Sequence, residues 1–406
     1  MSTHDNITAE QEIQRTLKLC NYCTKIIGIS LIDELPKSIF PKLWKYICFL
    51  GTMIILMLKE AGQISYAITK LGSSASVADF VAGLHIVGYD FISLSKLMTM
   101  WYKKNVFRNL IKELDDLWPS TNDDKEAADV KRMKLSRLGI VQFWYAFWNI
   151  LGVWLYNLTP LVIYLYHKFQ GDPADLGYIW HLTYFFDKTE PVYHELAFFF
   201  ETFSGLFSVG SMLGSDILFM TMASHISMLL RLLQNKIRRL EMKDNNNCYD
   251  EITSLIKIHQ RLITYGEDLE NAFCLVNLIN VVLSSVNICC VTFNILLDPL
   301  MVMSNKFYLA AVLTQVGIIC WFANDISESV RYLYLIIIYT YNKIVTKPNT
   351  ISGRRFNFFI YFACRSQKPL YFTAMKFSPI TMSTYSSILT TSYSYFALLY
   401  TMYRSN

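Results

Sequence analysis

Seven long apolar segments constrain the fold of this chain more than any other feature of its sequence. Each reaches the roughly 20 residues that an α-helix needs to cross the hydrocarbon core of a bilayer. Because lipid cannot hydrogen-bond to the backbone, apolar segments of this length indicate helices. The segments cover residues 42–68, 76–101, 138–166, 193–222, 272–297, 307–341 and 372–402. The sequence therefore predicts an all-α membrane protein with seven transmembrane helices.

The composition supports a membrane protein and disfavours a secreted, metal-binding or nucleic-acid-binding protein. Of the 406 residues, 53% are hydrophobic and 17% are charged, which is above and below the usual levels of soluble domains. Residues 1–35 are polar and lack the apolar core of a secretory signal. The nine Cys residues are scattered along the chain, and we expect core residues rather than disulfides or ligands. The net charge of +5 is distributed by loop, which does not indicate nucleic-acid binding.

The distribution of Lys and Arg predicts the orientation of the helices. With a cytoplasmic N-terminus, the inner segments 1–45, 102–137, 223–271 and 342–371 hold 28 of these residues. The outer side holds six, namely Lys59, Lys70, Lys168, Lys188, Lys306 and Arg404. Cytoplasmic loops carry such an excess of Lys and Arg, so we expect the N-terminus inside and the C-terminus outside. A G-protein-coupled receptor has the reverse orientation, which this distribution disfavours.

Two inner segments have the pattern of amphipathic helices. Apolar residues recur at helical spacing in residues 223–240 and again in residues 252–269, with a polar stretch between them. The predicted fourth and fifth spans therefore continue as helices below the membrane and form a hairpin. Their apolar stripe requires burial, either in a cytoplasmic helical cluster or against other subunits.

The last predicted span is unusually rich in hydroxyl groups. Of the 32 residues in 372–403, 12 are Ser or Thr. At helical spacing, one stripe of this segment contains Ser383, Ser387, Thr391 and Ser394 and continues to Leu398 and Met402. A water-filled path closed by apolar side chains would need such a stripe. Alternatively, the hydroxyls bond back to their own helix or pack against another helix.

Three sequence motifs resemble those of the insect odorant receptors. The tail contains Ser392-Tyr393-Ser394-Tyr395-Phe396 followed by Leu398-Leu399, residues 319–330 read ICWFANDISESV, and the predicted fourth span contains Leu213-Gly214-Ser215-Asp216 and His225-Ile226. The resemblance extends over the whole chain in its length, number of spans, orientation and short C-terminus.

This resemblance implies a ligand-gated, non-selective cation channel in the plasma membrane of a sensory dendrite. Four subunits surround one pore, the last span of each lines it, and the inner ends of spans four to seven form a shared anchor. In that arrangement, Ser387, Thr391 and Ser394 face the pore, and Leu398 and Met402 form its outer gate. The other partners would be olfactory co-receptor subunits in a heterotetramer, a small volatile odorant, the permeating cations and membrane lipid, with no cofactor.

The resemblance also divides the chain into functional segments. They are a cytoplasmic N-terminal segment (1–41), a ligand-binding bundle of spans one to four (42–222), a cytoplasmic hairpin (223–271), spans five and six (272–341), an anchor helix (342–371) and the pore-lining span with the C-terminus (372–406). The polar centre of the hairpin, KDNNNCYD, is short, as in odour-tuning subunits. The co-receptor has a longer loop at this position. Gustatory receptors carry Gln-Phe where this chain has Thr391-Ser392.

The family places its ligand among spans two to six, in the outer half of the membrane. A pocket for a small volatile is expected to be apolar and aromatic, with few polar groups. Asn149, Gly152 and Tyr156 lie on one helical face, where Gly152 would make room for a ligand. The candidates are His85, Tyr89, Asn149, Gly152, Tyr156, Phe203, Phe207, Met212 and Tyr308. Ordinary helix packing is the alternative for each. The apolar outer loop 167–195 is predicted to fold over the pocket as a lid.

No pattern in the sequence indicates an enzyme. It contains no Gly-rich phosphate loop, no His-Glu-x-x-His and no Gly-x-Ser-x-Gly motif. The alternative functions are a seven-span chemoreceptor that signals through a cytoplasmic partner and a gustatory-type receptor channel.

Overall fold

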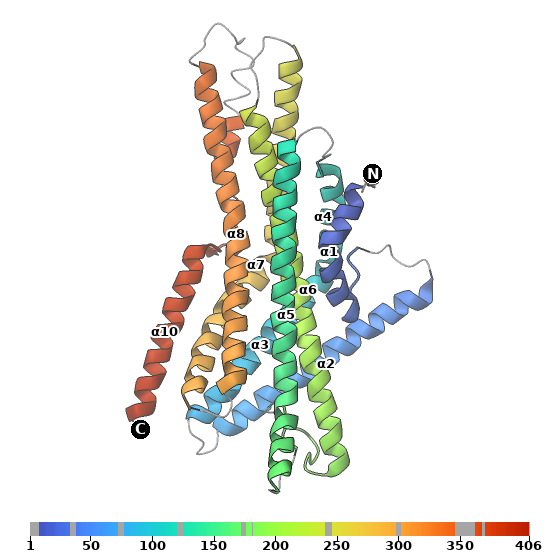
Figure 1. The fold of residues 1–406 in the computed structure, drawn as a ribbon, viewed down its shortest axis with the longest axis vertical. Helices are drawn as coiled ribbons and strands as arrows, with labels where there is room; N and C mark the ends of the chain where they lie inside the picture. The colour runs from blue at the N-terminus through green and yellow to red at the C-terminus, as the bar shows by residue number, and fades with distance from the viewer. Residues whose placement is uncertain are drawn as a thin grey trace.

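The structure, a computed structural model, is an elongated bundle of helices (Figure 1). It describes residues 8–32, 38–71, 77–119, 125–171, 176–180, 182–239, 246–297, 302–345, 362–367 and 370–405. The helices are α1 (Ala9–Ile26), α2 (Ile39–Leu71), α3 (Val77–Tyr102), α4 (Lys104–Leu117), α5 (Lys125–Gln170), α6 (Pro191–Arg238), α7 (Asn246–Leu297), α8 (Val302–Val345) and α10 (Met382–Ser405). A two-stranded hairpin of β1 (Thr373–Ala374) and β2 (Ser378–Pro379) precedes α10.

Five of the described helices, α2, α5, α6, α7 and α8, are long and apolar enough to cross a membrane. They contain the first, third, fourth, fifth and sixth predicted spans. The second and seventh predicted spans correspond to α3 and α10, which pack against α7 in the same bundle. Both contain polar groups that concern the candidate site, since α3 carries Asp90 and Lys96 and α10 carries the hydroxyl stripe.

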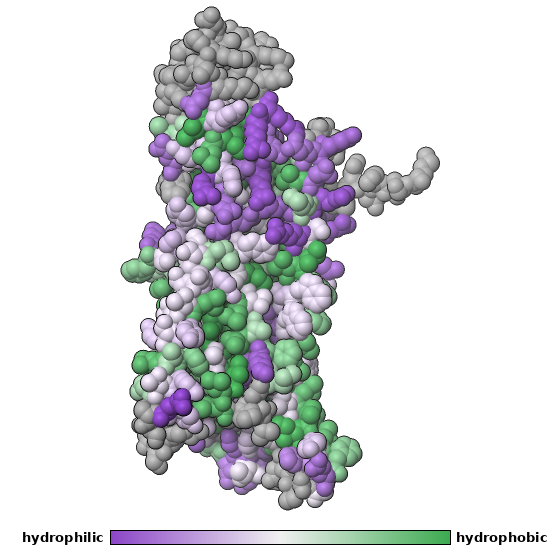
Figure 2. Space-filling model, turned by 60° about the vertical axis from the view of Figure 1, so that its left-hand side comes forward, coloured by the Kyte–Doolittle hydropathy of each residue, from purple (hydrophilic) through white to green (hydrophobic). Residues whose placement is uncertain are grey.

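The long helices pass from an apolar zone into a polar one. In Figure 2, hydrophobic side chains gather in the lower part of the molecule, and hydrophilic side chains gather above them. The helices α6 and α7 contain 48 and 52 residues, so each is more than twice as long as a bilayer crossing requires. The predicted helical extension beyond residue 222 is therefore present. The centre of the hairpin, residues 240–245, and most of the predicted anchor segment 342–371 lie outside the described residues.

The apolar stripe of the α6 extension is buried within the chain itself. Ile226, Leu230, Leu233 and Ile237 are each at most 2% exposed. The helices that pack against α6 include α1, α5, α7 and α8. The stripe is therefore buried in a helical cluster within the chain, which is one of the two alternatives; the other was burial against other subunits.

The predicted seventh span begins later than expected. Residues 372–381 are not helical, and the helix starts at Met382. Met375 and Lys376 have positive φ angles of 50° and 63°, and Pro379 has no N–H for a helical hydrogen bond. The hairpin is bound to the middle of α7, because the Met375 amide donates to the Cys274 carbonyl at 3.2 Å.

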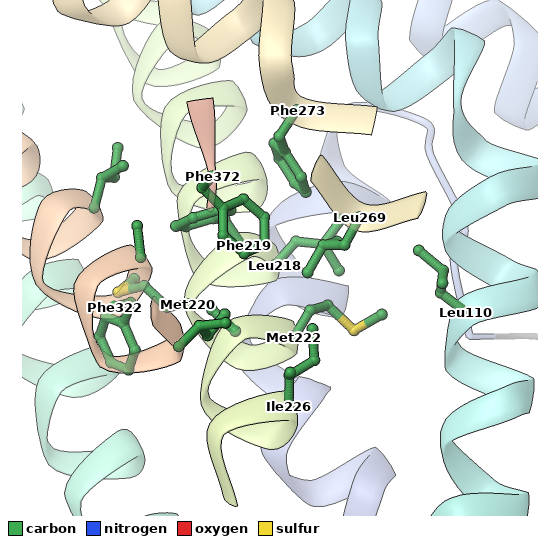
Figure 3. Packing of buried hydrophobic residues seen from close by; sticks show 14 of the residues in the cluster. Leu110, Leu218, Phe219, Met220, Met222, Ile226, Leu269, Phe273, Phe322 and Phe372 are labelled. Atoms are coloured by element: carbon green, nitrogen blue, oxygen red, sulfur yellow. The ribbon is translucent and has the colours of Figure 1, made fainter. Parts of the chain in front are cut away.

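A cluster of aromatic rings fixes the chain just before this hairpin. Phe372 is fully buried, and its ring lies edge-on to Phe219 of α6 at 5.1 Å. Phe219 in turn contacts Phe273 of α7 at 5.2 Å (Figure 3). Edge-to-face ring pairs of this kind contribute about 0.5–1.5 kcal/mol beyond their buried area. The entry to α10 is therefore anchored to α6 and α7.

Gly28 ends α1 in a conformation that other residues avoid. Its φ is +79°, and a Cβ there would lie 2.5 Å from both the Lys45 carbonyl oxygen and the Phe49 amide nitrogen. We predict that Gly28→Ala destabilises the protein by more than the ~1–2 kcal/mol of the backbone strain alone, because backbone atoms of α2 cannot move aside. Thermal unfolding of the purified chain measures this effect. Gly51→Ala is the matched control, since no atom lies within 4 Å of its added methyl group; equal melting temperatures for the two variants would contradict the prediction.

Candidate ligand-binding site

A pocket lies among α2, α3, α5, α6, α8 and the loop that precedes α6. The empty space inside it, with the open mouth included, is about 590 Å³, and its wall is mostly apolar, as in sites for small organic ligands. The lining residues are Lys59, His85, Ile86, Tyr89, Asn149, Gly152, Val153, Tyr156, Trp180, Gly205, Ser208, Val209, Phe307, Tyr308 and Ala311.

Six of the nine candidate ligand-binding residues lie around this pocket. His85 and Tyr89 are one turn apart on α3, and Asn149, Gly152 and Tyr156 share one face of α5. The Tyr308 ring of α8 lies 5.1 Å from that of His85 and 5.7 Å from that of Tyr89, both edge-on. The pocket wall is therefore a packed aromatic surface. The roles of these six residues in ligand binding stay predictions.

The other three candidates, all on α6, do not line the pocket. Phe203 is 53% exposed on the outside of the bundle, Phe207 packs against the hydrophobic core, and Met212 is buried beyond the pocket. The helix presents Gly205, Ser208 and Val209 instead. Aromatic residues lie on several faces of α6, so their spacing did not show which face points to the pocket. The face with small and polar side chains was the available signal.

Sequence analysis also missed a buried ion pair beside the pocket. The Lys59 ammonium lies 2.8 Å from the Asp90 carboxylate, and its side chain is 1% exposed. Asp90 also accepts hydrogen bonds from Gln63 at 2.8 Å and from Ser208 at 2.6 Å. Lys59, which the charge count placed on the outer side of the membrane, lies inside the helix bundle. A carboxylate within a predicted span was the available signal, since intramembrane charges require partners.

The loop before α6 closes one side of the pocket. The Trp180 ring stacks on Tyr156 at 5.3 Å and covers the Lys59 ammonium at 4.4 Å. The buried Glu201 carboxylate holds this loop, since it accepts hydrogen bonds from the Ile179 and Trp180 amides at 2.7 and 3.0 Å. The predicted folding of the loop over the pocket is confirmed for its Trp180.

A second ion pair lies deeper among the same helices. The Lys96 ammonium of α3 is 2.6 Å from the Asp216 carboxylate of α6. Asp216 also accepts from the Tyr145 hydroxyl of α5 at 2.7 Å and from the Gln315 amide of α8 at 3.1 Å. Gln315 lies 3.3 Å from the Asn280 side-chain oxygen of α7. This network joins five helices around a single carboxylate.

We predict that Asp216→Asn strongly destabilises the fold. The amide keeps the shape of the side chain but leaves the Lys96 charge buried without a counter-charge, which costs about 3–5 kcal/mol. The melting temperature and the yield of folded chain report the loss. Arg261→Gln is the control, because Arg261 is 44% exposed and lies 3.5 Å from its acidic partners, and exposed pairs contribute about 0–1 kcal/mol. Similar losses for the two variants would refute the importance of the Asp216 network.

The last helix presents the predicted hydroxyl stripe on its uncovered face. Ser383, Ser387, Thr391 and Ser394 are exposed, as are Leu398 and Met402 at 58% and 51%. Some of these hydroxyls also bond back to their own helix: Ser387 donates to the Ser383 carbonyl at 3.1 Å, and Ser394 donates to the Thr390 carbonyl at 3.0 Å.

The opposite face of α10 holds the helix against the bundle. Ile388 and Ser392 are 4% and 1% exposed, and the Ser392 hydroxyl donates to the Ser285 carbonyl of α7 at 3.0 Å. Tyr385 packs against α8 at Gly317. Within the described residues, no group of three or more His, Cys, Asp or Glu side chains could hold a metal ion.

A bundle of long apolar helices around an aromatic pocket is typical of a multi-pass membrane receptor. Residues 76–393 match the sequence profile of the 7tm odorant receptors, so the chain belongs to this family. Odorant receptor 85c of Drosophila melanogaster is 26% identical over 93% of the chain and 96% of its own length. Odorant receptor 85b of the same species is 24% identical over 96% of the chain and all of its own length.

The fold is also that of a solved insect receptor. The olfactory receptor OR5 of Machilis hrabei superposes with a TM-score of 0.81, covering 96% of the chain and 98% of OR5 at 16% identity. Its structure in complex with eugenol gives a TM-score of 0.80 over 97% of the chain and 99% of OR5. The match to the family's sequence profile confirms the resemblance to insect odorant receptors, and the superposition shows the shared fold.

Proposed function

We propose that the chain is an odour-tuning subunit of a ligand-gated, non-selective cation channel in the plasma membrane. It assembles with olfactory co-receptor subunits into a heterotetramer around one pore, which α10 lines. The observation that carries the proposal is the division of α10 into a face that packs on α7 and α8 and an uncovered face rich in hydroxyls.

The uncovered face of α10 suits water better than lipid. Hydroxyl groups gain nothing from contact with hydrocarbon, and a helix that faces lipid on this side has no reason to carry a stripe of them. The back-bonded hydroxyls at Ser387 and Ser394 keep their oxygen lone pairs directed outward, where they can accept hydrogen bonds from water. Leu398 and Met402 lie at the C-terminal end of the same face and form the hydrophobic gate.

The distribution of positive charge supports a cytoplasmic N-terminus. The inner segments hold 28 Lys and Arg residues, and the outer side holds six. This orientation places the pocket in the outer half of the membrane and the hairpin of α6 and α7 in the cytoplasm. It is opposite to that of a G-protein-coupled receptor.

The pocket binds the odorant, and α8 connects the pocket with α10. Tyr308 of α8 lines the pocket, and Gly317, farther along the same helix, contacts Tyr385 of α10. A ligand opens the channel only by the difference between its affinities for the open and closed arrangements. An odorant that displaces the outer part of α8 therefore shifts α10 and moves Leu398 away from the pore axis.

Coexpression with the co-receptor tests the channel function. In cells without G-protein signalling, we expect an odorant to evoke a fast current carried by Na⁺ and K⁺ alike, because the subunits themselves form the pore. Whole-cell recording with GDP-β-S in the pipette is the measurement. A current that disappears under nucleotide blockade would instead support a receptor that signals through a cytoplasmic partner.

Cysteine accessibility tests the pore-lining face. We predict that cysteines substituted singly at Ser387, Thr391 and Ser394 react with a water-soluble methanethiosulfonate reagent during odorant application, and that the reaction reduces the current. Ser392→Cys is the matched control, because Ser392 is buried against α7 on the opposite face. Equal modification rates for Thr391→Cys and Ser392→Cys would contradict the proposal that α10 lines the pore.

A further inference from the structure

One hydroxyl in the pocket has a proton to donate and no acceptor for it among the residues that the structure describes. Tyr89 lines the pocket, and among the described residues its hydroxyl makes no hydrogen bond, although its ring contacts Tyr308. Tyr89 is half-buried, and a pocket-lining hydroxyl of this kind is free to donate to whatever occupies the pocket. A bound ligand is the natural acceptor for this proton.

The other hydroxyls that line the pocket already donate to the protein. Tyr156 donates to the Asn305 side-chain oxygen at 3.1 Å, and Tyr308 donates to the His85 carbonyl at 3.2 Å. Ser208 donates to the Asp90 carboxylate at 2.6 Å. The described lining therefore has one uncommitted hydroxyl donor, and it belongs to Tyr89.

The charges beside the pocket also favour a ligand with a hydrogen-bond acceptor. Lys59 is a lining residue, whereas its partner Asp90 lies behind the wall. The positive partner of this ion pair therefore lies nearer the pocket than the negative one, and it attracts an atom with partial negative charge. The rest of the wall is aromatic, with Trp180 stacked on Tyr156 at 5.3 Å, and accepts a flat apolar body.

We propose that the pocket selects small, largely apolar odorants that carry a hydrogen-bond acceptor, such as a carbonyl oxygen, and that the Tyr89 hydroxyl donates to this acceptor. This inference rests on the proposed binding of an odorant in the pocket. It adds the chemical class of the ligand and identifies Tyr89 as the residue that determines this selectivity.

Acetophenone and 2-phenylpropene form a matched pair of probes for this proposal. They have nearly the same shape, but acetophenone has a carbonyl oxygen where 2-phenylpropene has a methylene group. The two compounds differ in hydration, so the informative quantity is the change in their affinity ratio between wild type and Tyr89→Phe. We expect Tyr89→Phe to weaken acetophenone binding by about 2- to 10-fold, which corresponds to one hydrogen bond, and to leave 2-phenylpropene binding unchanged.

Ligand-induced shifts in the melting temperature of the purified full-length chain give both affinities without requiring a current. Tyr156→Phe is the control: its hydroxyl is committed to Asn305, so the variant is expected to change both affinities by the same factor. Three results would overturn the proposal. They are an unchanged affinity ratio in Tyr89→Phe, an equal change of the ratio in Tyr156→Phe, and no binding of acetophenone to the wild type. Odorant-evoked currents that persist in any of these cases would leave the channel function intact.

Discussion

The pairing of Asp216 with Lys96 fixes the arrangement on which the rest of the bundle depends. Both side chains are buried among the helices, and an unpaired charge in such a place costs several kcal/mol. Because Tyr145 and Gln315 also donate to Asp216, α3, α5, α6 and α8 are held in one relative position. The same four helices form most of the pocket wall, so the shape of the pocket follows from this network.

The pocket combines groups that are committed to the fold with one that is not. Lys59, Asp90 and Ser208 satisfy one another, and Glu201 holds the loop that brings Trp180 over the pocket. These contacts stabilise the closed wall before any ligand arrives, which lowers the entropic cost of binding. Among the described lining residues, the Tyr89 hydroxyl has no such commitment, so it can respond to the chemistry of the ligand.

The last helix is attached to the bundle on one side only. Phe372 and the hairpin fix its beginning, while Ile388 and Ser392 hold one face against the neighbouring helices. In Figure 1, α10 stands at the edge of the bundle, and its C-terminal end lies far from the anchored end. Its C-terminal half also packs on α7, because Phe396 and Leu399 contact the buried cluster around Phe293, and the Tyr403 ring lies 5.8 Å from that of Phe293.

The sequence by itself determined the membrane class, the long helical extensions and the one-sided hydroxyl stripe of α10, because these depend on length and periodicity within single segments. It also led to His85, Tyr89 and Tyr156, which lie around the pocket. Only the tertiary structure decided that α6 turns Gly205 and Ser208 rather than Phe203 toward the pocket, that residues 372–381 are not helical, and that Lys59 pairs with Asp90. Local signals such as the intramembrane carboxylate were present, but the partners and the orientation of these residues depend on contacts between segments distant in the chain.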